Sequence, residues 1–373
     1  MRTLERPGTT GHAVTGRSRP ATRALLAVPA VACLLLGLDG ALKLLDVWSP
    51  APAARTGSAH GLLMTLGFVG ALIALERAAA LRHPLAYAAP VALAGGALLH
   101  LGTRTERLGS ALLLVGSVVL VLVYRQLWRR QRDDAVLVQA LGAVLAVGGA
   151  IGWLGGVPVD AIVPWLAGFL VLTIAGERLE LARIGMPASA GSLLMLGAAA
   201  VAVSALSLLL WPSAGPLFGL ALALVVGWLV RHDVARRTVR SAGLPQYSAI
   251  SMLTGQVWLG VAAGVWLLGD PATGGTAYDA AVHAVFLGFT MSMVMAHAPI
   301  ILPVVARVRL PFHRALYVPL SLLQLGLVIR LWPGDMLGIT WAWQVGGVLT
   351  VLALVAFVAC VVTLVATSGR RTT

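Results

Sequence analysis

Long apolar runs, each close to twenty residues, follow one another along almost the whole chain and are separated by Gly, Pro or charged residues. About twenty apolar residues in an α-helix cross the hydrocarbon core of a bilayer, so each run predicts a transmembrane helix. The predicted spans are 24–46, 59–81, 84–102, 109–128, 135–156, 159–180, 189–211, 214–231, 247–268, 277–303, 312–332 and 338–367. The pattern therefore predicts an all-α polytopic membrane protein with about twelve transmembrane helices.

The predicted domain organisation is a single twelve-helix bundle over residues 24–367. Residues 1–23 are polar and rich in arginine, glycine and proline, which predicts a disordered basic cytoplasmic tail. Residues 368–373 predict a short cytoplasmic C-terminal tail.

Short motifs recur four spans apart. Ile-Ala-x-Glu-Arg occurs at 73–77 in span 2 and at 174–178 in span 6. A histidine followed by Leu-Gly-Phe occurs at 60–68 in span 2 and at 283–289 in span 10. Spans 2, 6 and 10 therefore correspond to one another, which favours three four-helix arcs in a pseudo-threefold arrangement.

Composition and charge placement support a membrane location. Only 11% of the 373 residues are charged, against about a quarter in a soluble domain. Of the arginines, 22 fall in the tails and loops on the side of both termini and four fall on the other side. This asymmetry places both termini in the cytoplasm of a bacterium, with the bundle in the inner (plasma) membrane. It assigns the net charge of +13 to topology and contact with the lipid bilayer, and excludes a nucleic-acid partner. The two cysteines lie in apolar segments and indicate no disulfide framework.

Ionisable residues inside predicted spans form two layers. Because such residues are costly in hydrocarbon, each needs a partner, a ligand or a function. The layer on the outer side contains His60, His100 and His283; the layer on the cytoplasmic side contains Glu76, Glu177 and His297. Each also has a structural interpretation: His60 and His100 as interfacial residues at helix ends, His283 and His297 as hydrogen-bonded core histidines, and Glu76 and Glu177 as helix-end ion pairs with the following arginines.

Two imidazoles at similar depth on spans 2 and 10 are what a b-type haem requires, since neutral ring nitrogens bind the iron from opposite faces. We therefore expect His60 and His283 to be the axial pair. Gly67, seven residues after His60, is expected on the same helix face, where it would let the macrocycle approach the backbone. Asp279 lies one turn before His283 and is expected to fix its ring tautomer. Imidazoles also suit copper, with His100 or Met64 completing a metal site.

Two stretches resemble a known family. "HAVFLGFTMSM" (283–293) and "AHGLLMTLGFVGALIA" (59–74) are similar to histidine-containing segments of the NnrS family. The resemblance implies a twelve-span bacterial membrane protein that contains haem and copper and acts in nitric oxide metabolism or nitrosative-stress resistance. In a wider sense the chain resembles the heme-copper oxidase catalytic subunit, whose low-spin haem is held by histidines of spans 2 and 10. Span 6 contains no histidine here, so oxygen reduction of the oxidase type is not expected.

Three functions remain open at this point. The first is an NnrS-like haem protein that handles nitric oxide or transfers electrons with a redox partner protein; as an enzyme it would be a haem-dependent oxidoreductase. In that reading Glu76, Glu177 and His297 form a proton path from the cytoplasm. The second is a proton-coupled transporter that uses the same three residues. The parallel repeat, and prolines that break span 10 only near its inner end, count against transport. The third is a membrane partner protein without a cofactor.

Overall fold

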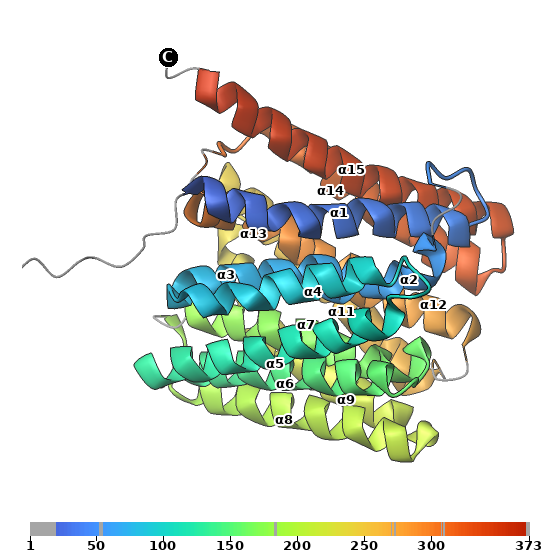
Figure 1. The fold of residues 1–373 in the computed structure, drawn as a ribbon, viewed down its shortest axis with the longest axis horizontal. Coiled ribbons are helices and arrows are strands. Elements are labelled where there is room, and N and C mark those ends of the chain that lie inside the picture. Colours follow the sequence, from blue (N-terminus) through green and yellow to red (C-terminus); the bar gives the residue numbers. More distant parts are fainter. Residues whose placement is uncertain are drawn as a thin grey trace, which may run out of the picture.

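Helices account for all regular structure in the part of the chain that the computed structural model describes, which comprises residues 20–51, 55–182, 185–269, 271, 274–306, 308 and 310–370. The long helices lie side by side in one bundle (Figure 1). Within these ranges, eleven helical segments are long and apolar enough to cross a membrane, and Pro84–Leu99 is a shorter apolar helix. The prediction of an all-α polytopic membrane protein is confirmed.

The twelve segments follow the predicted order. The first four are α1 (Pro20–Leu44), α2–η1–α3 (Thr56–Leu62, Leu63–Gly70, Ala71–Leu81), η2–α4 (Pro84–Tyr87, Ala88–Leu99) and α5 (Glu106–Arg130). The next four are α6 (Asp134–Leu154), α7 (Val159–Ala182), α8 (Ser189–Leu210) and η4–α9 (Pro212–Ala214, Gly215–His232). After the short α10 (Ala235–Thr238) come α11 (Leu244–Leu268), α12–η6–α13 (Gly275–His283, Ala284–Met291, Ser292–Ala306), η7–α14–η8 (Arg314–Leu316, Tyr317–Ile329, Arg330–Met336) and α15 (Thr340–Arg370).

Both predicted tails are shorter than expected. Helix α1 begins at Pro20, and α15 continues to Arg370, so residues 20–23 and 368–370 are helical. The rest of the predicted tails, residues 1–19 and 371–373, lies outside the described residues.

Spans 2, 6 and 10 are the innermost helices. The buried shares of their most apolar windows are 72%, 78% and 61%, whereas those of the other long segments lie between 28% and 56%. Helices α5 and α6, α9 and α11, and α15 and α1 contact one another, which closes the outer helices around the inner three. The second member of each predicted four-helix unit is therefore the most buried of the long segments of its unit, and the pseudo-threefold arrangement stays a prediction.

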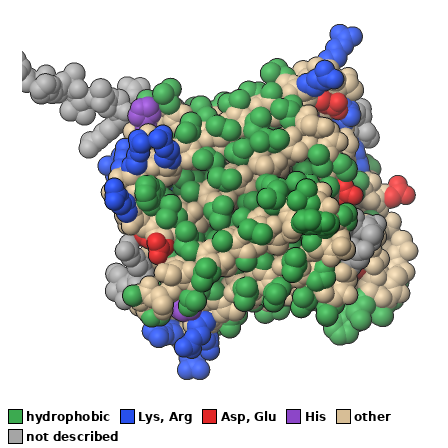
Figure 2. All heavy atoms as spheres, turned by 90° about the horizontal axis from the view of Figure 1, so that it is seen from below, with side chains coloured by type: hydrophobic (Ala, Val, Ile, Leu, Met, Phe, Trp, Pro, Cys, Tyr) green, Lys and Arg blue, Asp and Glu red, His purple; other side chains and the backbone are tan. Residues whose placement is uncertain are grey.

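The outer surface is apolar between two charged ends. Figure 2 shows hydrophobic side chains across the middle of the face in view and lysine, arginine and acidic side chains toward its ends. Large apolar side chains such as Leu196 and Val203 of α8 are exposed. A soluble protein rarely exposes so much contiguous apolar surface, so these side chains face lipid.

In two of the three inner spans, the α-helix gives way to a π-helical segment within a few residues after a histidine. Residues 63–70 (η1) follow His60, and residues 284–291 (η6) follow His283; both segments are π-helical. Such segments are rare and are frequent at functional sites. The two segments that carry these histidines, α2 and α12, lie at the same end of the bundle (Figure 1).

The close contact between α14–η8 and α15 depends on Gly346. A Cβ atom there would lie 2.5 Å from the main-chain nitrogen of Arg330 and 2.6 Å from the carbonyl oxygen of Gly326. Because backbone atoms cannot move aside, we expect Gly346→Ala to lower the free energy of unfolding by about 1–3 kcal/mol. Denaturant unfolding in detergent micelles measures this effect. Gly264→Ala is the control, since a Cβ at Gly264 meets no atom within 4 Å; equal stability of the two variants would contradict the prediction.

Candidate functional site

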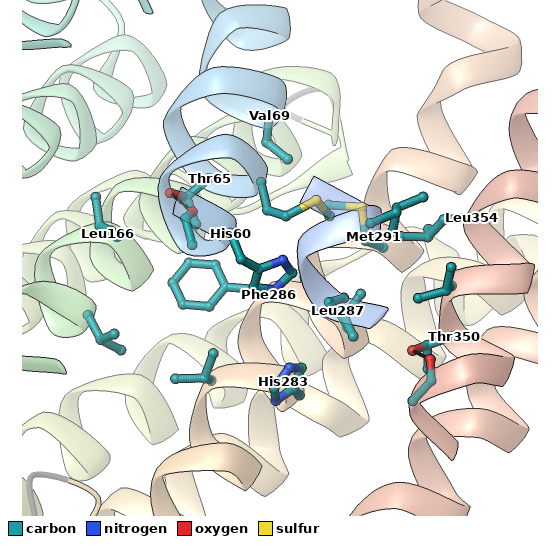
Figure 3. A pocket seen from close by; sticks show the side chains of 18 of the residues that line it. His60, Thr65, Val69, Leu166, His283, Phe286, Leu287, Met291, Thr350 and Leu354 are labelled. Carbon is teal, nitrogen blue, oxygen red and sulfur yellow. Dashed lines mark hydrogen bonds between the residues drawn. The ribbon is translucent and has the colours of Figure 1, made fainter. Parts of the chain in front are cut away.

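A cavity of about 90 Å³ lies between the inner spans and the helices α1, η8 and α15. Its walls are mostly apolar, with Val163 and Leu166 from α7, Phe286 from η6 and Leu354 from α15. The side chains of His60 and His283 both reach this cavity (Figure 3). The structure therefore brings together the two histidines that the sequence analysis paired.

The imidazole of His60 is held by α1. Its Nδ1 lies 2.7 Å from the carbonyl oxygen of Gly37. A carbonyl oxygen only accepts hydrogen bonds, so Nδ1 carries the proton and the Nε2 of the neutral ring keeps its lone pair. Among the described residues, no hydrogen bond involves this Nε2.

The imidazole of His283 is held in the same way, by its own helix. Its Nδ1 lies 2.8 Å from the carbonyl oxygen of Asp279 and 3.2 Å from Asp279 Oδ1. Both oxygens are acceptors, so the neutral ring again keeps its lone pair on Nε2. The expected contact between Asp279 and His283 is present, and its role in fixing the tautomer stays a prediction.

Asp279 is itself fixed by Arg330, a residue that the sequence analysis missed. Arg330 Nε lies 2.8 Å from Asp279 Oδ2, and Arg330 Nη2 lies 2.7 Å from Oδ1. The guanidinium also stacks over the ring of Trp343, 4.7 Å from its centroid. Arg330 is one of the four arginines that the charge pattern places on the outer side, but it is only 6% exposed and begins η8. The apolar residues on both sides of Arg330 were the available signal.

Gly67 lies away from the cavity, contrary to expectation. A Cβ atom there would lie 2.6 Å from the Cβ of Ala97 and 2.9 Å from Cys33 Sγ. The glycine therefore lets η1 pack against α1 and α4 and has no contact with the cavity.

His100 also lies away from the cavity, whereas Met64 lines it. Helix α4 ends at Leu99, and the ring of His100 packs against α6, where Trp153 Nε1 donates to its Nε2 over 3.3 Å. Ser110 of α5 lies 3.4 Å from the same nitrogen. A nitrogen that accepts a hydrogen bond is not available as a metal ligand, so this position does not support the proposed role of His100.

The inner layer divides into two parts. Glu76 and Glu177 meet at Arg77, whose Nη2 lies 2.9 Å from Glu76 Oε1 and 3.3 Å from Glu177 Oε1. His297 takes no part in these contacts. It is buried, and its Nδ1 lies 2.8 Å from the carbonyl oxygen of Met293. The expected ion pair of Glu76 with Arg77 and the expected hydrogen bond of His297 are present, whereas the ion pair of Glu177 within the described residues is with Arg77 and not with Arg178, the arginine that follows it.

The donor atoms at the cavity suit a haem iron or a soft metal ion. His60, His283, Met64 and Met291 line the cavity, and the hydrogen bonds at Nδ1 leave both imidazole Nε2 atoms unprotonated. Within the described ranges, no group of three or more His, Cys, Asp or Glu side chains has an arrangement that could hold a metal ion. The cavity is smaller than the pockets of about 300–1,000 Å³ that hold whole cofactors, so a macrocycle would displace side chains such as Phe286.

Comparison with known proteins adds a family and no activity. A search of curated proteins found no match. Residues 23–366, nearly the whole bundle, match a family that is defined without a known function. The chain belongs to this family, the domain of unknown function DUF8744.

Proposed function

We propose that this chain is an NnrS-like membrane protein that binds b-type haem between His60 and His283 and acts in nitric oxide metabolism, the nitrosative-stress response or electron transfer. One observation carries the proposal. Each of the two imidazoles gives its Nδ1 proton to a carbonyl oxygen, which leaves Nε2 unprotonated, and both side chains line one apolar cavity. This is the tautomer that axial ligation of haem iron requires.

The chain's own residues would prepare the ligands. Hydrogen bonds at Nδ1 orient both rings and raise the basicity of Nε2. Arg330 holds Asp279 against His283, and the apolar walls limit the access of water. Bound haem held by both histidines would supply one-electron chemistry, and one of the two histidines would have to leave the iron before a small gas molecule could bind. The location proposed for this chemistry is the inner membrane of a bacterium, with both termini cytoplasmic and a redox partner protein supplying electrons.

Copper is a second candidate ligand for the same cavity. The cavity of about 90 Å³ is large enough for an ion without displacement of side chains, and two methionine sulfurs line it beside the histidines. Thioether and imidazole ligands together suit Cu(I). In this version of the proposal, the sulfur atoms of Met64 and Met291 and the two imidazoles together bind the copper ion.

The test is a reduced-minus-oxidised absorption spectrum of the purified protein in detergent, together with iron and copper analysis. We expect a sharp α-band of b-type haem that is lost in His60→Ala and in His283→Ala, since either change removes one axial nitrogen. His100→Ala is the matched control and should keep the band, because His100 lies outside the cavity.

Three other outcomes are informative. If the protein binds stoichiometric copper and no haem, and the same two variants lose the copper, then copper is the ligand of the cavity in place of haem. Folded wild-type protein that binds neither haem nor copper when both are supplied would overturn the proposal and leave the transporter and the cofactor-free partner. A band that survives both histidine changes would overturn the assignment of the site.

A further inference from the structure

A second buried polar group lies at the opposite end of the inner spans. Its centre is Arg77 of α3, which is only 7% exposed. Arg77 contacts three carboxylates: Glu76 of the same helix at 2.9 Å, and Glu177 and Glu180 of α7 at 3.3 Å and 3.2 Å. We call these four residues the Arg77 cluster. The cluster has no contact with the cavity that holds His60 and His283.

The charges of the Arg77 cluster do not balance. Three ionised carboxylates and one guanidinium carry a formal charge of −2. Arg178, which follows Glu177, is also buried and interacts with Glu177, but Asp233, directly after α9, interacts with Arg178 as well and offsets its charge. Uncompensated charge is expensive to bury, so the cluster is stabilised by taking up a cation.

Two further side chains indicate which cation this is. Tyr124 of α5 and Gln139 of α6 are both fully buried, and neither Tyr124 Oη nor Gln139 Oε1 has a hydrogen-bond partner within the described residues. Tyr124 interacts electrostatically with all four members of the cluster. Gln139 Nε2 donates to Glu180 Oε2 over 3.1 Å, which places its free oxygen beside the carboxylates.

Unpaired buried polar atoms cost about 1–3 kcal/mol each. Gln139 Oε1 only accepts hydrogen bonds, so it can pair with a protonated carboxyl group and not with a carboxylate, whereas the Tyr124 hydroxyl can pair with either. The described residues offer no metal-binding arrangement of acidic side chains here. The negative charge and the unpaired Gln139 Oε1 favour the uptake of a cation, and the lack of a metal-binding arrangement among the described residues favours a proton as that cation.

The three carboxylates differ in exposure, which indicates the route by which a proton reaches the cluster. The side chain of Glu180 is 40% exposed, that of Glu76 is 26% exposed, and that of Glu177 is 11% exposed. Glu180 and Glu177 lie on the same helix, one turn apart, and share Arg77 as partner. Glu180 thus connects the surface at this end of the bundle with the most deeply buried carboxylate.

We propose that the Arg77 cluster is a proton-binding site in which Glu177 holds one exchangeable proton that arrives from the surface through Glu180. The Glu180 carboxylate accepts the proton from a hydronium ion and leaves water, and then passes it to the Glu177 carboxylate and becomes ionised again. Arg77 stays charged throughout and pairs with whichever carboxylates are ionised. This inference goes beyond the proposed function, because it needs neither haem nor the cavity.

Infrared spectroscopy of the full-length protein in detergent tests the proposal. At neutral pH we expect the C=O stretching band of a protonated carboxyl group, which shifts when water is replaced by deuterated water. Glu177→Gln should abolish this band. Glu180→Gln should keep it but slow its hydrogen–deuterium exchange by about 10²-fold, the usual contribution of a positioned proton-transfer group.

The control is Glu106→Gln, which changes a half-exposed glutamate paired with Arg55 at the other end of the bundle and should alter neither band nor exchange. Should Glu177→Gln fail to fold, Glu177→Asp serves instead and is expected to move the band to a new frequency. Absence of the band in wild-type protein, its persistence at the same frequency in the Glu177 variants, or unchanged exchange in Glu180→Gln would each overturn the proposal. None of these results depends on whether haem is bound.

Discussion

Replacing Arg77 by alanine should lower the free energy of unfolding by about 3–5 kcal/mol, the usual cost of removing one partner from a buried ionic group. The guanidinium is the shared cation of three carboxylates, and its loss leaves them facing one another in the interior. Arg77→Lys should recover only part of the loss, because an ammonium group cannot reproduce the planar fork that contacts all three. Denaturant unfolding in mixed micelles measures these differences.

Acid should reduce the effect of Arg77→Ala. Protonated carboxyl groups are neutral and need no cation. The difference in the free energy of unfolding between Arg77→Ala and the wild type should therefore become smaller as the pH falls. The double variant Arg77→Ala/Glu76→Gln should likewise be more stable than Arg77→Ala alone, since it removes one of the negative charges that lose their cation. Arg55→Ala is the control, because Arg55 forms a half-exposed pair with Glu106. Exposed pairs contribute about 0–1 kcal/mol, and a loss of this size in Arg77→Ala would show that the cluster is not a buried ionic group.

The sequence predicts the fold well because an apolar run of bilayer length has few alternatives. Its backbone groups must be paired within the segment, and a helix achieves this. The predicted span 84–102 is longer than the helical segment in the structure, which covers only Pro84–Leu99. The ends of α1 and α15 were also misplaced. There, polar residues extend a helix that the apolar pattern alone would end earlier.

The two central histidines were predictable because each combines an apolar setting with a similar depth on corresponding spans. The contact between Asp279 and His283 was predictable because residues four apart share a helix face. Arg330 and Trp343 were not predictable as their partners. Both come from distant segments, η8 and α15, and meet Asp279 only through the packing of the bundle.

The position of Gly67 shows where helical periodicity misleads. The expectation that Gly67 shares a face with His60 used the α-helical repeat over seven residues. Residues 63–70 are π-helical, which changes the number of residues per turn and so rotates Gly67 toward α1 and α4. Nothing in the apolar pattern signals this change. His297 does not line the cavity, as expected from the fourteen residues that separate it from His283 along the same span.

Asp279→Ala should be the most damaging single change near the cavity. It removes the carboxylate that receives two hydrogen bonds from Arg330, whose guanidinium is only 6% exposed. We expect the free energy of unfolding to fall by about 3–5 kcal/mol. It also removes one of the two acceptors at His283 Nδ1. If His283 is an axial ligand, the affinity for haem or copper should fall by about 10–100-fold, as is usual when the partner of a metal-binding histidine is lost.

Titration of the purified protein with haem and with copper, alongside unfolding in micelles, separates the two effects of Asp279→Ala. Asp160→Ala is the matched control. Asp160 is partly exposed at the start of α7, and its carboxylate only accepts a hydrogen bond from the next main-chain nitrogen. This variant should change neither affinity nor stability by more than a small amount. A loss of stability without a loss of affinity would make Asp279 a purely structural partner of Arg330. Full affinity in both Asp279→Ala and His283→Ala would remove His283 from the site, and with it the pairing of spans 2 and 10 around a shared ligand.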